Sequence, residues 1–136
     1  MSERRATILV VDDHPANVKA LRVELTADGH DVIEATNGYE AVEAVERDAP
    51  DLVLLDIMMP GMDGYQVCRK IKENQGRDFL PVIMVTAKTD TESVVKAFGI
   101  GADEYVTKPF EPLELMSRVN SMLRIRSMYL ENVSLK

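Results

Sequence analysis

The sequence has little of what marks secreted, membrane-spanning or nucleic-acid-coating proteins. Its single cysteine, Cys68, excludes an internal disulfide and suits a reducing compartment, so we expect a cytoplasmic protein. It has no apolar run long enough to cross a bilayer, and its first residues lead into a hydrophobic strand without the apolar region of a signal peptide. The net charge of −7 disfavours nonspecific binding to nucleic-acid phosphates. We therefore expect no direct nucleic-acid partner and no membrane partner.

What the sequence does have is a regular alternation of short aliphatic runs and amphipathic stretches. Its 136 residues are typical of one domain with a proper core. The aliphatic runs predict five strands, at Thr7–Asp12, Asp31–Ala35, Leu52–Asp56, Pro81–Thr86 and Glu104–Thr107. The first, third and fourth runs are aliphatic nearly throughout, which is typical of strands covered on both faces. The second and fifth are shorter and more polar, so we place them toward the sheet edges.

Helix-start and helix-stop residues fill the intervals between these strands. The expected helices begin at Pro15, Asn37-Gly38, Asp63, Asp90 or Thr91, and Pro112. Gly29 stops the first helix, and the Gly99-Ile-Gly101 turn stops the fourth. Five strand–helix repeats with short loops predict an α/β fold, a doubly wound parallel sheet with helices on both faces.

The last helix has an apolar pattern that continues past the length needed to cover a sheet. Heptad spacing relates five apolar residues, with Arg126 interrupting it: Met116, Val119, Leu123, Leu130 and Val133. Two interpretations stay open, a packed helix with a frayed polar tail, or a linker helix that pairs with a second copy or leads into a further domain. We therefore divide the chain into a domain over 1–125 and a C-terminal extension over 126–136.

Carboxylates close two of the buried strands. Asp12 and Asp13 follow the first strand, and Asp56 follows the third. The carboxyl ends of parallel strands share one edge of the sheet, where open α/β folds place their sites. Carboxylates crowded there repel one another unless a cation or a shared proton intervenes. Because the cluster is costly for stability alone, it indicates a metal site, a nucleophile or both.

A hydroxyl and an ammonium end two further strands at the same edge. Thr86 ends the fourth strand, and Lys108 follows the fifth. The acids can hold Mg²⁺ through oxygen, and the metal and Lys108 can neutralise a transferring phosphoryl group. Asp56 can then be the nucleophile that forms an acyl phosphate. Each residue alone has an ordinary structural role, such as a helix cap or a surface lysine, and only the combination favours phosphoryl chemistry.

With these motifs in order, the chain resembles the receiver domains of response regulators in two-component signalling. The resemblance covers residues 7–125 and rests on Val-Val-Asp12-Asp13, Leu-Leu-Asp56-Ile-Met-Met-Pro60-Gly61, Val-Thr86-Ala87, Tyr105 and Lys108-Pro109-Phe110. It implies a flavodoxin-like fold with the strand order 2-1-3-4-5. It also implies a phosphoacceptor switch that assists its own phosphorylation and dephosphorylation and is not a turnover enzyme.

The resemblance implies a role for each residue of the acid cluster. Asp56 would accept a phosphoryl group from a sensor histidine kinase or a histidine phosphotransfer protein. Mg²⁺, or Mn²⁺ in its place, would be bound by Asp13, Asp56 and the backbone carbonyl of Met58, with Asp12 helping through water. Lys108 would contact the phosphoryl oxygen and Asp56. In this family the side chain two residues after the phosphorylated aspartate influences water access, so the bulky apolar Met58 predicts slow dephosphorylation.

The resemblance further implies a switch and a surface that responds to it. Thr86 would reach the phosphoryl group in the activated state, and Tyr105 would turn inward behind it. The Lys108–Pro109 peptide bond would be cis. The surface expected to change consists of the helix after Asp90, the strand Glu104–Thr107 and the helix from Pro112. A homodimer is expected to form through this surface or through the last helix.

Other functions and the output stay open. An aspartate-nucleophile phosphatase would have a similar site with a second acid two residues after the nucleophile, where this chain has Met58. A flavodoxin-like cofactor module would need glycines and hydroxyls where Asp12-Asp13 would repel phosphate. A receiver used only for binding would not need the complete set of acids, hydroxyl and lysine that this chain has. Three features together resemble receivers that precede diguanylate cyclase domains: Asp12-Asp13-His-Pro-Ala-Asn17, Met-Met-Pro-Gly-Met-Asp-Gly and a long basic-hydrophobic last helix. Receivers of hybrid histidine kinases share the first of these.

Overall fold

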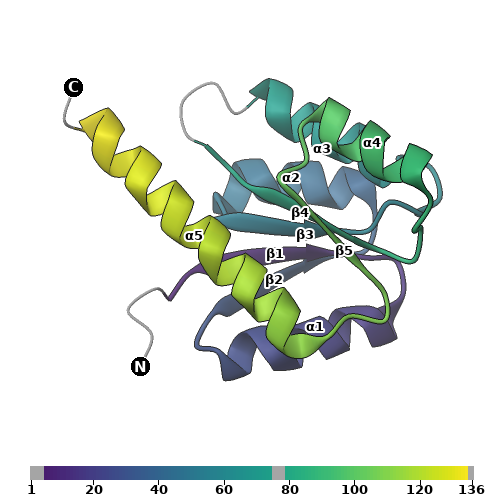
Figure 1. The fold of residues 1–136 in the computed structure, drawn as a ribbon, viewed down its shortest axis with the longest axis horizontal. Helices are drawn as coiled ribbons and strands as arrows, with labels where there is room; N and C mark the ends of the chain where they lie inside the picture. Colours follow the sequence, from purple (N-terminus) through teal and green to yellow (C-terminus); the bar gives the residue numbers. More distant parts are fainter. Residues whose placement is uncertain (1–4, 75–78, 135–136) are drawn as a thin grey trace.

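A computed structural model describes residues 5–74 and 79–134, in which strands and helices alternate along the chain (Figure 1). The strands are β1 (Thr7–Val11), β2 (Asp31–Ala35), β3 (Leu52–Leu55), β4 (Val82–Thr86) and β5 (Glu104–Thr107). The helices are α1 (Pro15–Ala27), α2 (Gly38–Asp48), α3 (Gly64–Asn74), α4 (Thr91–Ile100) and α5 (Pro112–Ser134). All strand pairs are parallel, in the order β2-β1-β3-β4-β5. The predicted fold and strand order are confirmed, with the two more polar strands at the edges.

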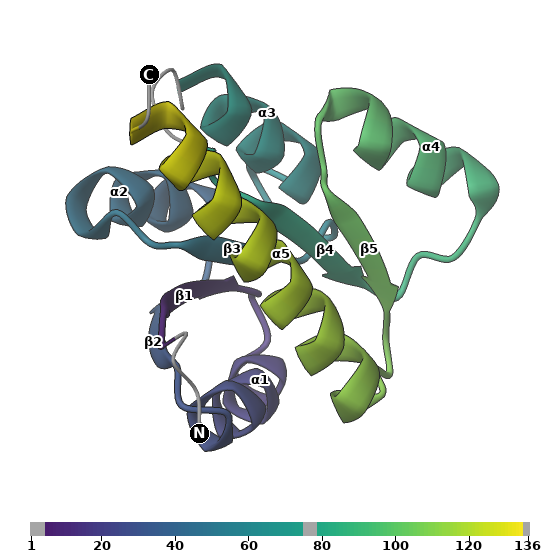
Figure 2. The ribbon, with the colours of Figure 1, turned by 60° about the vertical axis from the view of Figure 1, so that its left-hand side comes forward.

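Successive side chains of the central strands enter different cores. Leu9 and Val11 of β1 belong to one core, with buried residues of α2 and α3. Ile8 and Val10 belong to the other, which α1 and α5 complete. Figure 2 shows α5 crossing one face of the sheet while α2 and α3 lie behind the strands. The continuous aliphatic runs follow from this arrangement, because a strand with helices on both faces has no solvent side.

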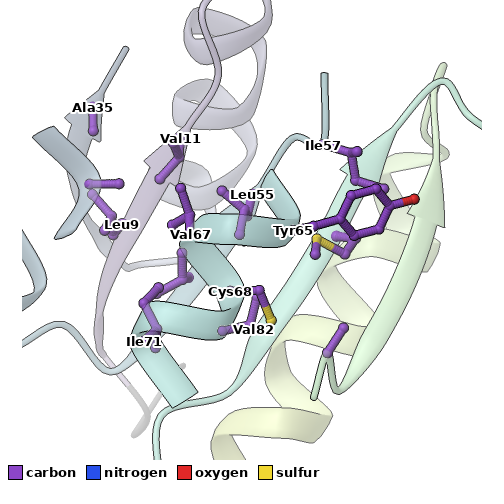
Figure 3. Close-up of a cluster of buried hydrophobic side chains, with 14 of the residues drawn as sticks. Leu9, Val11, Ala35, Leu55, Ile57, Tyr65, Val67, Cys68, Ile71 and Val82 are labelled. Carbon is purple, nitrogen blue, oxygen red and sulfur yellow. The ribbon is translucent and has the colours of Figure 1, made fainter. Parts of the chain in front are cut away.

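The start of α3 packs closely on the sheet. Figure 3 shows Val67 of α3 near the strand residues Val11 and Leu55, and Cys68 of α3 near Val82 of β4, within one buried cluster. Burial raises the pKa of the Cys68 thiol to about 11, so the sulfur is protonated at neutral pH. Cys68 is therefore a small apolar core residue.

Side-chain caps fix the helices that follow the strand ends. Asn37 accepts a hydrogen bond from the Glu40 amide at 2.9 Å, and Asp90 accepts one from Ser93 at the same distance. Asp63 and Gln66 form a reciprocal pair, in which each side chain accepts from the other residue's amide, at 2.9 and 3.0 Å. These caps begin the helices at the positions that the sequence predicts.

The last helix is continuous over Pro112–Ser134, which includes most of the residues for which a frayed tail is one interpretation. Arg126 interrupts the heptad because its guanidinium turns back to the body of the domain. It donates to the Phe79 carbonyl at 3.0 Å and to Asp51 at 3.1 Å. The Tyr129 ring packs edge-on against Phe79. The side chain of the heptad residue Val133 lies outside the described residues.

Within residues 5–74 and 79–134, none of the helices has the length and apolar character of a membrane span.

Candidate functional site

Asp12 and Asp56 begin the loops that leave two central strands. The strands end at Val11 and Leu55, one residue earlier than expected, but the ladder continues through the aspartate amides. Asp12 donates to Ala35 at 3.2 Å, and Asp56 donates to Val11 at 3.0 Å. Both residues are buried. Their carboxylates are thus held at adjacent strand ends, as the parallel topology predicts.

The start of α3 fixes the loop that presents Asp56. The Gly64 amide donates to the Ile57 carbonyl at 2.8 Å. A Cβ atom at Gly64 would overlap the Asp56 carbonyl oxygen and would lie 2.6 Å from the Ile57 Cα. Only glycine fits this approach, so the helix supports the loop directly from behind.

Lys108, which follows the edge strand β5, contacts both buried carboxylates. Its Nζ lies 2.6 Å from Asp12 Oδ2 and 3.4 Å from Asp56 Oδ2. Its amide donates to the Thr86 carbonyl at 2.9 Å, and the following Lys108–Pro109 peptide bond is cis. One ammonium therefore lies between two carboxylates, and a third carboxylate adjoins them.

That third carboxylate, Asp13, has a buried oxygen that lacks a hydrogen-bond donor among the described residues. This Oδ1 lies 3.1 Å from Nδ1 of His14, whose side chain is largely exposed. Asp12, by contrast, accepts from the His14 amide at 3.0 Å and from Asn17 at 3.5 Å. One ligand atom from each of Asp12, Asp13, His14 and Asp56 can be chosen so that all lie within 4.8 Å of one another. Three carboxylates against one lysine and an orphaned oxygen fit a hard divalent cation.

His14 and Asn17 thus join a site in which the family resemblance gives them no role. Both lie near the acids because α1 begins directly after the first strand end. Their signal in the sequence is only that they follow Asp12 and Asp13 closely.

Thr86 and Tyr105 are both hydrogen-bonded to the backbone of one residue of the β4–α4 loop, Lys88. The buried Thr86 hydroxyl accepts from the Lys88 amide at 3.5 Å, and the Tyr105 hydroxyl donates to the Lys88 carbonyl at 2.8 Å. Burial raises the pKa of Tyr105 to about 12, so this hydroxyl is a proton donor at neutral pH. The two side chains are linked through Lys88 without touching each other's polar atoms.

Met58 adjoins the Asp56 carboxylate through its backbone. Its amide donates to Asp56 Oδ1 at 3.4 Å, while its side chain is exposed. The site therefore presents an acid set, a lysine and a threonine at the carboxyl edge of the sheet, with an apolar side chain two residues after Asp56.

This fold and site define a phosphoacceptor domain of the α/β class. Residues 8–120 match the family described as the response regulator receiver domain, and the chain belongs to this family. It is 47% identical over 124 residues to the DNA-binding response regulator MtrA of Mycolicibacterium smegmatis. The aligned residues cover 91% of this chain and 53% of MtrA. It is 42% identical over 121 residues to the response regulator PleD of Caulobacter vibrioides, covering 89% of this chain and 27% of PleD.

A solved structure extends the similarity to the fold. NtrX from Brucella abortus matches with a TM-score of 0.89 and 30% identity, covering 97% of this chain and 30% of that one. The chain thus spans about half of MtrA and under a third of PleD and NtrX. It is a phosphoacceptor receiver of two-component signalling, and the DNA binding in MtrA's name belongs to MtrA.

Proposed function

We propose that Asp56 is the phosphoacceptor and that a sensor histidine kinase or a histidine phosphotransfer protein is the donor. A carboxylate oxygen of Asp56 attacks the phosphorus of the donor's phosphohistidine. The P–N bond breaks, and the leaving imidazole nitrogen keeps the electron pair. The observation that supports this most is the position of Lys108, whose ammonium lies against Asp12 and Asp56. From there it can stabilise the negative charge of a phosphoryl oxygen on Asp56.

We assign the acid cluster to Mg²⁺, with Mn²⁺ as a substitute. Asp13, Asp56 and the Met58 carbonyl would bind the ion directly, and Asp12 would act through water. The orphaned Asp13 oxygen and the excess of carboxylates over lysine support this assignment. The bound ion would supply the positive charge that a transferring phosphoryl group needs.

Thr86 and Tyr105 are the proposed switch. If the Thr86 hydroxyl moves to the phosphoryl group, it leaves the Lys88 amide, and the carbonyl of the same residue accepts from Tyr105. Phosphorylation would thereby shift an existing equilibrium at α4, β5 and α5. This face or the last helix would then bind a second copy, and residues 126–136 would connect the domain to its output.

The function we propose is that of a switch and not of a phosphatase with turnover. Met58 offers no acid or base at the position where such phosphatases place one. The cytoplasm is the proposed compartment, since phosphoryl groups reach histidine kinases from ATP there. The net charge of −7 favours a protein partner over direct contact between this domain and nucleic acid.

Incubation with a small acyl phosphate and Mg²⁺, followed by intact-mass measurement, tests the proposal. We expect a mass increase of one phosphoryl group, which is lost in Asp56→Asn and on removal of the metal. Asp63→Asn is the matched control, because Asp63 caps α3 in the same loop and should leave phosphorylation unchanged. A phosphorylated Asp56→Asn variant would refute the assignment.

A further inference from the structure

The methionines of the β3–α3 loop differ sharply in exposure. The Met58 residue is 57% exposed, whereas Met59 and Met62 in the same loop are 7% and 8% exposed. Among the described residues, Met128 on α5 has the same exposure as Met58. Cys68 offers no competing thiolate, because it is buried and protonated at neutral pH. An oxidant in solution therefore meets an exposed thioether on a residue whose amide contacts the Asp56 carboxylate.

We propose that Met58 is an oxidation site, and that its sulfoxide shortens the lifetime of the phosphoryl group on Asp56. This inference rests on the proposed function of Asp56. It assigns to the receiver a sensitivity to peroxide-class oxidants, exerted through the duration of the signal.

The oxidation step needs no group from the protein besides the thioether. The Met58 sulfur attacks one oxygen of a hydroperoxide, the O–O bond breaks, and the other oxygen leaves and takes up a proton. With hydrogen peroxide the leaving product is water. The sulfur loses two electrons and the peroxide gains them, and methionine sulfoxide reductases reverse the change. Buried Met59 and Met62 are shielded from the same reaction while the domain is folded.

The position of Met58 connects its oxidation to Asp56. Its amide donates to Asp56 Oδ1 at 3.4 Å, so its side chain branches from a residue in contact with the phosphoacceptor. A thioether is at most a weak hydrogen-bond acceptor, and this side chain cannot orient water. A sulfoxide oxygen is polar and can accept a hydrogen bond from an approaching water.

Hydrolysis of the acyl phosphate then proceeds with this water held near the phosphorus. The water oxygen bonds to phosphorus, the bond between phosphorus and the Asp56 oxygen breaks, and a proton passes to solvent. The products are the Asp56 carboxylate and inorganic phosphate. Orientation of the attacking water is a large part of the barrier to such a step.

The test uses hydrogen peroxide on the whole chain, followed by peptide mapping and measurement of phosphoryl decay. We expect Met58 and Met128 to be oxidised and Met59 and Met62 to be spared. Phosphoryl loss should become several-fold faster in the oxidised parent and return toward its first value after treatment with sulfoxide reductases. Oxidised Met128→Leu should behave as the oxidised parent. Met58→Leu should have the same decay rate before and after peroxide.

Two results would overturn the inference: Met58 left unoxidised when Met128 is modified, or a decay rate that Met58 sulfoxide does not change. Failure of the proposed function is a different result, since Asp56 would then carry no phosphoryl group in the untreated protein. Peptide mapping reads the oxidation itself in either case.

Discussion

At the scale of single residues, two adjacent aspartates of the site differ in how well their carboxylates are hydrogen-bonded. Asp13 Oδ1 is buried without a hydrogen-bond donor in residues 5–74 and 79–134, and two further carboxylates adjoin it. Asp12, in contrast, has Lys108 at 2.6 Å and accepts from the His14 amide. The two adjacent aspartates should therefore respond in opposite directions to loss of charge.

Asp13→Asn should raise the free energy of unfolding in metal-free buffer by about 1 kcal/mol, because it removes one of three carboxylates that repel one another. The same change should abolish the extra stability that Mg²⁺ gives the parent. Asp12→Asn, the matched control, should lower stability because Lys108 loses its closest partner. Urea unfolding with and without Mg²⁺ measures both. If Asp13→Asn is less stable than the parent and still responds to Mg²⁺, Asp13 is a structural residue.

At the scale of elements, the contact between β3 and α3 positions the phosphoacceptor. Gly64 at the start of α3 leaves no space for a side chain against the Asp56 carbonyl. Gly99 in α4 is different, because a Cβ there meets no atom of the described residues within 4 Å. Gly64 and Gly99 are therefore expected to respond differently to alanine.

Gly64→Ala should destabilise the domain by roughly 3 kcal/mol through overpacking and should also slow phosphorylation of Asp56. Gly99→Ala should be neutral or stabilise the domain by about 0.5–1 kcal/mol, because alanine is the better helix former. Thermal or urea unfolding and the rate of acyl-phosphate labelling measure the two effects. Equal stability of Gly64→Ala and the parent would contradict the close approach of α3 to the loop.

The elements also mark where sequence reasoning succeeds and where it ends. Aliphatic runs predict every strand to within one residue at its ends, and cap residues predict every helix start, because those signals are local. Arg126 looks in the sequence like a break in a heptad, yet it is the residue that ties α5 to Asp51 and Phe79. Its partners lie 75 and 47 residues away in the chain, and no periodicity specifies such a pair.

At the scale of the whole molecule, the two edges of the sheet differ in how well their polar groups are paired. The carboxyl edge holds three carboxylates around one lysine. At the amino edge, Lys72 bonds Asp103 at 2.7 Å, and the buried ring of His30 bonds Asn120 of α5 at 3.1 Å. The carboxyl edge follows from the parallel topology and could be predicted. The amino-edge pairs join distant segments, and the sequence offers no local signal for them.

This contrast suggests how a change at one edge is confined to part of the molecule. The amino-edge contacts hold the far half of α5, while Thr86, Tyr105 and Lys88 connect the site to α4 and β5. The segments near the switch are the ones expected to move, and the clamped segments are expected to stay in place.

The most direct test is to add beryllium fluoride and Mg²⁺, which mimic the phosphoryl group on Asp56, and to record backbone amide shifts by NMR. We predict shifts around Asp56 and also throughout α4, β5 and the first turns of α5, with no response in Asp56→Asn. Shifts confined to the residues around Asp56, or an equal response in Asp56→Asn, would contradict a phosphorylation switch centred on this residue.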